Sequence, residues 1–198
     1  MKTFLIDKNY SDLILSSPDN GDEGNISWYF IADSALSNAG KPFFLPPTEI
    51  KTAFGIALRI GRLGKTISRK FSLRYVDAIA PIVNFRMTEE FQKLQKENLS
   101  VDPAVSFDKA VFYGSFVELE EKNMYISFDL NLNSEPIDSI KLEVNKIIEL
   151  VIPKISKYNT LKIGDLIIPG LSDFHNLSKG DKVEIRDNGE NILSIKIK

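Results

Sequence analysis

Two stretches of small and apolar residues place the strongest constraint on what this chain can fold into. They are residues 53–60 (AFGIALRI), which end at Gly61, and residues 78–85 (AIAPIVNF). A short apolar run bounded by turn signals is typical of a strand buried on both faces. Pro81 weakens the second prediction, because a proline has no amide hydrogen to give to a ladder. The two stretches therefore predict two buried strands.

Other strands are predicted from residue type and from alternation. The segments concerned are residues 3–6, 26–32, 124–132, 182–186 and 192–198. Residues 26–32 are aromatic and β-branched, as strands favour. Residues 124–132 alternate cleanly, with Asn131 on the polar face. Asn188-Gly189 lies between the last two segments and is a strong hairpin signal.

Helices are predicted in three places. Residues 89–97 (EEFQKLQKE) are good helix formers, and residues 65–75 are expected to form a turn and a short helix. From Asp138 onward, apolar residues recur at steps of three and four, which marks one face of a helix. They are Ile140, Val144, Ile147, Val151 and Ile155. We expect Pro153 to kink or end the last turn.

These elements predict a mixed α/β, strand-rich fold with two or three short helices, in a single domain of residues 1–198. The net charge of -2 and the pI near 5.6 predict no bulk affinity for nucleic acid. The absence of cysteine excludes disulfides, thiolate nucleophiles and sulfur metal sites. With no signal peptide and no membrane-spanning run, we expect a cytoplasmic protein with no membrane partner.

Several local patterns suggest chemistry that closer inspection does not support. Gly64-Lys65-Thr66 would end a phosphate-binding loop, but Arg59 stands where that motif requires its first glycine. The acidic segment 16–25 lacks the glycine position of a calcium loop, so we interpret it as a solvated loop. His175 has no second histidine or cysteine to help it bind a metal, and we expect it to be a loop residue.

A basic stretch is the most distinctive charge feature. No acidic residue lies between Glu49 and Asp77. The bases in its central part are Arg59, Arg62, Lys65, Arg69, Lys70 and Arg74. If they share a face, they would attract an anionic ligand, a nucleic-acid backbone or an acidic partner. Charge runs are usually solvated faces, so this stretch alone does not decide the function.

Several segments, in order along the chain, resemble the fumarylacetoacetate hydrolase family. Asn9-Tyr10 resembles the family's Arg-Asn-Tyr, and residues 106–108 resemble its Lys-x-Phe-Asp. Residues 56–67 resemble the strand and turn after the family's Glu-x-Glu, and residues 75–98 resemble the segment with its third metal carboxylate and the helix that follows. Residues 161–167 are similar to its Leu-x-Pro-Gly-Asp-Leu-Ile, and residues 179–184 to its Pro-Gly-Asp-x-Val-x-Val. The resemblance covers most of the chain. It implies a mixed β-sandwich roll that binds magnesium or manganese, usually as a homodimer.

The resemblance also implies a chemistry. Family members cleave, decarboxylate or isomerise small β-diketo and 2-oxo acids. The metal gathers the keto and carboxylate oxygens of the substrate and stabilises an enolate. In this sequence, the positions of the pocket would be Asn9, Tyr10, Thr52, Arg86, Val105, Ser106 and Asp108.

The sequence departs from the family where the metal would bind. The Glu-x-Glu pair falls on Ala53 and Gly55, and the third carboxylate falls on Asn84. Thr52 stands for the preceding histidine of many members, and Val105 stands for the active-site lysine. Magnesium usually needs one or two carboxylates, and no acid lies between residues 50 and 76 to replace them. We therefore expect no bound metal.

Three hypotheses follow. The first is a non-catalytic binding or structural protein, forming a homodimer, with the basic stretch as its interaction surface. The second is an enzyme of altered chemistry that holds small oxo-acids through Arg86 or Arg59, with hydrogen bonds from Asn84 and Tyr10. The third is an unrelated module that binds an anion or nucleic acid through residues 59–74.

Overall fold

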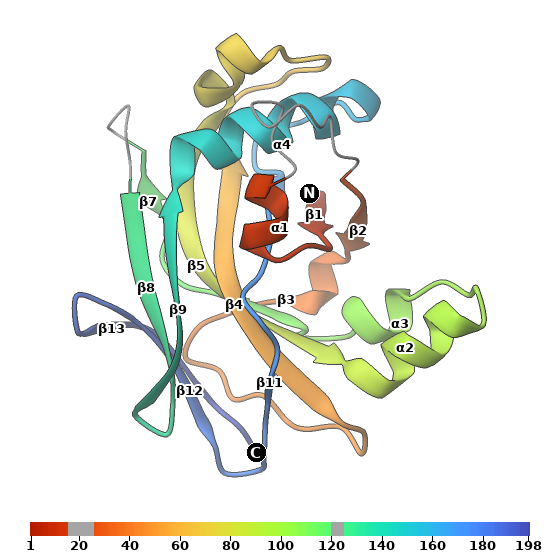
Figure 1. Ribbon diagram of the computed structural model, residues 1–198, viewed down its shortest axis with the longest axis vertical. Helices are drawn as coiled ribbons and strands as arrows, with labels where there is room; N and C mark the ends of the chain where they lie inside the picture. The colour runs from red at the N-terminus through yellow and green to blue at the C-terminus, as the bar shows by residue number, and fades with distance from the viewer. Residues whose placement is uncertain (16–25, 120–124) are drawn as a thin grey trace.

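The computed structural model describes residues 1–15, 26–119 and 125–198, and contains two β-sheets that roll around a common core (Figure 1). The first sheet has the order β2-β1-β10-β4-β5-β6-β3, with β11 beside β4 and β7 beside β5. The second has the order β13-β12-β8-β9. The mixed, strand-rich class expected from the sequence is confirmed.

The nine strands of the first sheet are β1 (Thr3–Ile6), β2 (Trp28–Ile31), β3 (Leu36–Asn38), β4 (Ile50–Ile60), β5 (Val76–Met87), β6 (Val111–Tyr113), β7 (Val117–Glu118), β10 (Leu166–Ile168) and β11 (His175–Asn176). The four strands of the second are β8 (Tyr125–Leu132), β9 (Glu135–Glu143), β12 (Lys182–Asp187) and β13 (Glu190–Lys196). The helices are α1 (Tyr10–Leu15), α2 (Thr88–Lys96), α3 (Asp102–Val105), α4 (Val144–Tyr158) and the 3₁₀ segments η2 (Asp33–Ala35) and η3 (Arg69–Tyr75). No helix in these described parts is long and apolar enough to cross a membrane.

The two apolar runs form the central strands β4 and β5, which pair antiparallel along their length. Both strands are buried on both faces, as their composition predicts. Pro81 is tolerated because β6 pairs with residues 82–84 and β7 with residues 78–79, which leaves Pro81 between them. There the Gly114 amide donates a 2.9 Å hydrogen bond to the Pro81 carbonyl. The amide hydrogen that proline lacks is not needed at this position.

Alternate side chains of β4 enter two separate cores. Phe54, Ile56 and Leu58 join the larger cluster, which the two sheets and α4 enclose. Ala53 and Ala57 face the smaller cluster, together with residues of α2 and α3. The small side chains on that face let the second core lie close to the sheet. The metal positions expected from the family resemblance are therefore on strands that form the core of the fold.

One expectation for the helices is wrong. The helix predicted from Asp138 begins at Val144, and residues 135–143 form strand β9. Ile140 fits both patterns, because β9 buries Ile140 and Leu142 on alternate positions. Pro153 lies inside α4, which continues to Tyr158 because its apolar face packs into the larger core. The sequence patterns also did not predict α1 and α3, which are only four to six residues long.

The hairpin prediction at the C-terminal end is confirmed. Asn188 and Gly189 both adopt positive φ between β12 and β13, as the tight hairpin turn requires. In β8 the predicted alternation fails at Asn131, which is buried rather than exposed. A bulge between Leu130 and Asn131 shifts the register there. The predicted loop 16–25 and Met124 lie outside the described residues.

Asp165, at the turn before β10, links the N-terminal strand to the rest of the first sheet. Its side chain is almost fully buried and accepts hydrogen bonds from the amides of Lys2 (2.8 Å) and Lys162 (2.9 Å). The Lys2 ammonium group lies 3.2 Å from the same carboxylate. One side chain thus fixes the start of β1 beside β10.

We predict that Asp165→Ala lowers the free energy of unfolding by about 3 kcal/mol, because two amides lose their acceptor in a buried position. Urea denaturation measures this change. The control is Asp108→Ala, since Asp108 is exposed, and its effect should stay within about 0.5 kcal/mol. Equal effects of the two substitutions would show that Asp165 does not have this structural role.

Candidate functional site

The candidate site lies along one edge of β4, where its partner strands leave an opening. One edge of β4 pairs with β5 throughout. The other edge pairs with β10 at Leu58 and Arg59, and with β11 at Lys51 and Thr52. Residues 53–57 lie between these two pairings, so their backbone groups need other partners.

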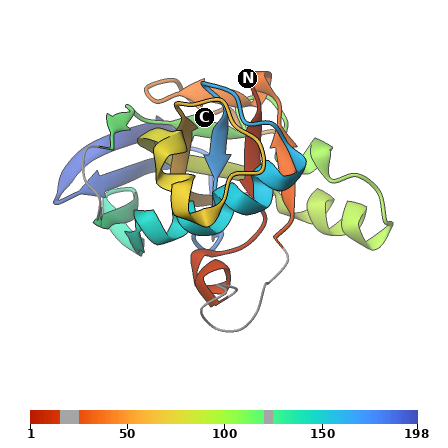
Figure 2. The same ribbon diagram turned by 90° about the horizontal axis from the view of Figure 1, so that it is seen from above.

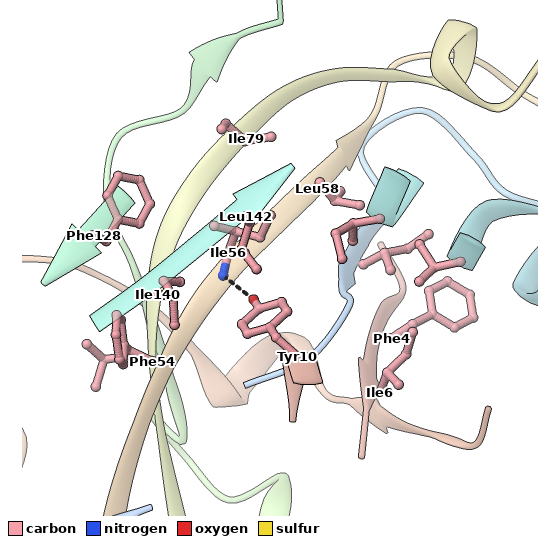
Figure 3. Packing of buried hydrophobic residues seen from close by; sticks show 14 of the residues in the cluster. Phe4, Ile6, Tyr10, Phe54, Ile56, Leu58, Ile79, Phe128, Ile140 and Leu142 are labelled. Atoms are coloured by element: carbon pink, nitrogen blue, oxygen red, sulfur yellow. Dashed lines mark hydrogen bonds between the residues drawn. The ribbon is translucent and has the colours of Figure 1, made fainter. Parts of the chain in front are cut away.

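Side chains from two distant segments fill this opening. The Tyr10 hydroxyl, at the start of α1, accepts a hydrogen bond of 3.0 Å from the Ile56 amide (Figure 3). The Ser172 hydroxyl accepts one of 3.1 Å from the Phe54 amide. The Ser172 amide in turn donates to the Phe54 carbonyl at 2.8 Å. Tyr10 and Ser172 thus replace the missing strand.

Gly55 lies directly beneath the Tyr10 hydroxyl. A Cβ atom at Gly55 would lie 2.6 Å from the Tyr10 Oη and 2.8 Å from the Gly170 carbonyl oxygen. Real Cβ atoms essentially never approach other atoms so closely, and one of the two contacts is with backbone. Any side chain at position 55 would therefore require Tyr10 and the loop at Gly170 to move. The space in front of Gly55 is filled by protein.

The other two positions expected to hold the metal face each other across β4 and β5. Ala53 pairs with Asn84 in the strand register, and both side chains are buried. The Asn84 Nδ2 donates a long hydrogen bond of 3.4 Å to the Ala110 carbonyl. Its Oδ1 is buried and has no hydrogen-bond partner. That oxygen is the sole side-chain acceptor that these three positions offer.

This donor set does not fit magnesium or manganese. A methyl group, a glycine and one amide supply no negative charge, and hard divalent cations rely on carboxylate oxygens. In the parts of the chain that the structure describes, no three acidic or histidine side chains are grouped so that they could hold a metal ion. The family's metal chemistry has no anchor among Ala53, Gly55 and Asn84.

Tyr10 is also a poor general base or acid at neutral pH. Burial raises the pKa of its hydroxyl well above the usual value, and the hydrogen bond from the Ile56 amide lowers it by less. The hydroxyl therefore stays neutral, and its oxygen serves as an acceptor for the backbone. Its role in this structure is to complete the sheet edge.

A pocket of about 270 Å³ remains beside the filled opening. Asp7, Asp12 and Asp173 contribute carboxylates to its lining, and Lys8 and Arg86 contribute positive charge. The mixed charges would suit a small polar ligand with groups of both signs better than a simple anion.

Arg86 is the most constrained side chain of this pocket. Its Nη2 donates a 3.0 Å hydrogen bond to Asp7 Oδ1. Its guanidinium lies between the rings of Phe91 and Phe174, 4.4 Å from each centroid. The Nε is buried and has no partner in the structure. Arg86 is thus already paired with an internal carboxylate.

Tyr29 completes this network by donating a 2.7 Å hydrogen bond to Asp7 Oδ2. Burial raises the pKa of the Tyr29 hydroxyl, and the hydrogen bond and charge of Asp7 raise it further. Arg86 opposes this shift but does not cancel it. Sequence reasoning identified Arg86 and missed Asp7, Tyr29 and Phe174, because no local pattern indicates that they converge.

The remaining pocket positions expected from the resemblance do not form one site. Asn9 lines the 270 Å³ pocket, and its Oδ1 accepts a hydrogen bond from the Asp12 amide. Val105 packs in the smaller core with Ala53, and Thr52 is buried with its hydroxyl unpaired. Ser106 accepts a hydrogen bond from the Ala32 amide, and Asp108 is exposed.

The six bases of the basic stretch fall into two groups, two in ion pairs and four exposed. Arg59 forms an ion pair with Asp77 at 2.8 Å, and Arg69 forms one with Glu149 at 3.1 Å. The Arg59 pair lies at the far end of β4 from Thr52, so Arg59 is not placed to hold a ligand at the candidate site. The other four bases, Arg62, Lys65, Lys70 and Arg74, are exposed.

The expectation for His175 is wrong. His175 belongs to strand β11, opposite Thr52, and is not in a loop. Its Nε2 lies 3.1 Å from Asp138 Oδ2 on β9, so it connects the two sheets. No local pattern predicts this contact, because the two residues are far apart in the chain and belong to different sheets.

No protein-family model matches the sequence, and no curated protein sequence matches it. Solved structures do match the fold. A fumarylpyruvate hydrolase from Pseudomonas aeruginosa, in complex with Mn²⁺ and pyruvate, is similar with a TM-score of 0.84 and 14% identity, over 100% of this chain and 89% of that chain. A fumarylacetoacetate hydrolase family protein from Yersinia pestis CO92 gives 0.82 and 18%, over 100% and 92%.

A 5-carboxymethyl-2-hydroxymuconate delta-isomerase from Mycobacterium smegmatis is similar with a TM-score of 0.82 and 16% identity, over 99% of this chain and 76% of that chain. These likenesses extend over the whole chain and show that it has the fold of fumarylacetoacetate hydrolase family proteins. The fold expected from the sequence resemblance is therefore confirmed. The identities are low, so the activities of these neighbours do not transfer with the fold.

We predict that Gly55→Ala destabilises the wild-type protein by about 3 kcal/mol, because the methyl group would overlap the Tyr10 hydroxyl and the Gly170 carbonyl. Tyr10→Phe alone should cost about 1–2 kcal/mol, because the buried Ile56 amide loses its acceptor. In the Tyr10→Phe background, Gly55→Ala should cost less, by about 1 kcal/mol. A double-mutant cycle from urea denaturation measures the coupling, and strict additivity would contradict the proposed contact.

The raised pKa of Tyr29 gives a pH prediction. The pKa of the Tyr29 hydroxyl is higher in the folded protein than in the unfolded chain. The contribution of Tyr29 to the free energy of unfolding is therefore complete below the unfolded-state pKa and is lost as the pH rises toward the folded-state pKa. The free energy of unfolding of the wild type should thus fall more steeply above about pH 10 than that of Tyr29→Phe. Denaturation at a series of alkaline pH values measures both slopes, and lysines contribute equally to each. Identical slopes would contradict the prediction.

Proposed function

We propose that this chain is a divergent member of the fumarylacetoacetate hydrolase family that acts without the family's metal chemistry, as a non-catalytic binding or structural protein. The observation that carries the proposal is the Tyr10 hydroxyl, which a side chain at Gly55 would overlap. A metal ligand at that position has no room, and the paired positions Ala53 and Asn84 carry no charge. The neighbours of this fold include a hydrolase in complex with Mn²⁺ and an isomerase, so the fold itself is compatible with a metal site.

The burial of the site supports the same proposal. Ala53, Asn84 and Val105 are all buried in the core, in contact with residues that hold the sheet together. The opening along β4 is closed by the Tyr10 and Ser172 hydroxyls, which accept hydrogen bonds from the Ile56 and Phe54 amides, so a substrate would have to break backbone contacts to reach these positions. We further propose that the protein is a cytoplasmic homodimer, as the family resemblance implies.

A second candidate is an enzyme of altered chemistry on small 2-oxo acids, and the 270 Å³ pocket at Arg86 favours it. In this reading the guanidinium would hold a substrate carboxylate. The ion pair between Arg86 and Asp7 weighs against it, because a substrate would have to compete with an internal carboxylate. The pocket also carries three aspartates, which disfavour an anion.

We predict that neither magnesium nor manganese raises the melting temperature of the purified protein. A ligand at a hundred times its dissociation constant would stabilise the fold by about 2.7 kcal/mol, which thermal denaturation detects readily. In parallel, acylpyruvate and oxaloacetate should not be turned over with either metal, beyond the rate of a protein-free control.

Two outcomes would contradict the proposal in different ways. Turnover that depends on metal and disappears with a chelator would show that the family site survives. Turnover without metal that is lost in Arg86→Lys, but kept in the control Lys51→Arg, would instead establish the second candidate. Lys51 pairs with Glu49 on the surface at 3.4 Å and lies outside the pocket.

A further inference from the structure

One end of the molecule gathers two segments that contain no acidic residue. The first is residues 61–76, the part of the acid-free stretch that follows β4, and the second is residues 150–164 at the end of α4 and beyond. Figure 2 looks down on this end, where η3 and α4 lie side by side. The sequence showed the first segment as a charge run, and the fold adds the second.

Backbone hydrogen bonds fix the two segments against each other. The amides of Gly64 and Leu161 each donate to the carbonyl of the other, at 3.0 and 2.8 Å. The Thr66 amide donates to the Ser156 carbonyl at 2.9 Å, and the Gly164 amide to the Ile60 carbonyl at 2.8 Å. The bases on the two segments therefore form one surface, which we term the basic end. Besides Arg69, which pairs with Glu149, its exposed bases are Arg62, Lys65, Lys70, Arg74, Lys157 and Lys162.

In the part of the chain that the structure describes, the acids Asp77, Glu149 and Asp165 border the basic end, and each has a partner within the protein. Asp77 pairs with Arg59, and Glu149 pairs with Arg69. Asp165 is buried and accepts two backbone amides. The six exposed bases therefore give this end a strong positive potential, although the whole chain has a net charge of -2.

Large apolar side chains stand exposed among these bases. They are Leu63 (62% exposed), Phe71 (40%), Tyr158 (68%) and Ile163 (72%). The described part of the chain has ten such exposed hydrophobic residues, so four of them gather at this one end. Phe71 lies beneath Lys70 and Arg74, with their cationic groups 5.7 and 4.9 Å from its ring centroid. Apolar groups rimmed by positive charge mark an interaction surface.

We propose that the basic end docks on an anionic lipid surface, with Leu63 and Ile163 entering the boundary between headgroups and acyl chains. Lysines near such a surface are attracted by its negative potential, and buried aliphatic groups add a hydrophobic contribution. Tyr158 suits the same depth, because its ring is apolar and its hydroxyl can stay hydrated. Docking of this kind requires no membrane-spanning helix, so it replaces the expectation of no membrane partner, which rested on the lack of a spanning run in the sequence.

The chemistry of the basic end favours lipid over the other anionic partners. Four of the six bases are lysines, whereas protein interfaces are depleted in lysine and enriched in arginine. Single-stranded nucleic acid is held by aromatic rings that stack on bases. Here Leu63 and Ile163 are aliphatic, and the rings of Phe71 and Tyr158 already have cationic groups of the protein over them. Aliphatic side chains beside lysines match a headgroup surface best.

The test is co-sedimentation of the full chain with vesicles of phosphatidylcholine alone, or of three parts phosphatidylcholine to one part phosphatidylserine. We expect binding to the phosphatidylserine vesicles only, and its loss at high salt. Lys65→Gln with Lys162→Gln should weaken binding by about tenfold or more, from the loss of two charges near the surface. Leu63→Ser with Ile163→Ser should weaken binding by a similar factor, about tenfold, through lost apolar contact.

The matched control is Lys96→Gln with Leu99→Ser, which alters an exposed base at the end of α2 and an exposed aliphatic residue just after it. This control should bind as the wild type does, and all variants should keep the wild-type melting temperature because the altered side chains are exposed. Equal binding to both kinds of vesicle, or no loss of binding in the two test variants, would overturn the proposal. So would the absence of vesicle binding, whether or not the protein binds a single-stranded oligonucleotide or an acidic peptide.

Discussion

The architecture of the site depends on the need to satisfy backbone groups along the open edge of β4. Strands β10 and β11 leave residues 53–57 unpaired on that side, and buried amides without acceptors are costly. Tyr10 and Ser172 supply the missing partners, one from the first helix and one from the loop after β10. This solution places the Tyr10 hydroxyl over Gly55 and the Gly170 carbonyl beside it. The same contacts that complete the sheet therefore fill the space in which the family resemblance places a metal ligand.

Electrostatics explains why neutral residues belong with this filled space. Carboxylates that are buried side by side without a cation each carry a desolvation penalty, and they also repel one another. Ala53 and Gly55 remove that penalty, and Asn84 keeps one polar group of similar size in the strand register. The nearby pocket shows the opposite solution, in which buried charge is retained because Asp7, Arg86 and Tyr29 satisfy one another. The charges of Asp7 and Arg86 are thus accommodated because each has a hydrogen-bond partner inside the protein.

Much of the fold could be predicted from the sequence, because its strongest signals are local. The apolar runs, the Asn188-Gly189 turn and the polar surface helix each depend on residues close together in the chain. Ile140 misled the prediction because it fits both the helical and the strand period. The positions where the family resemblance places a metal could be named from the sequence. The closure at Gly55 by Tyr10 could not, because a contact between residues 10 and 55 follows from tertiary structure. The same holds for the pairing of His175 with Asp138, and for the second acid-free segment beside the basic stretch.

The proposed loss of the metal site rests on the filled space at Gly55, where the Tyr10 hydroxyl and the Gly170 carbonyl leave no room for a side chain. The most direct measurement is a titration with Mn²⁺ followed by nuclear magnetic resonance of the backbone amides, because this paramagnetic ion broadens signals close to it. We expect the amides of Ala53, Gly55, Ile56 and Asn84 to keep their line widths relative to the rest of the chain. Selective broadening of these signals at low manganese concentration, reversed by a chelator, would show a bound ion at this position and would overturn the proposed loss of the metal site.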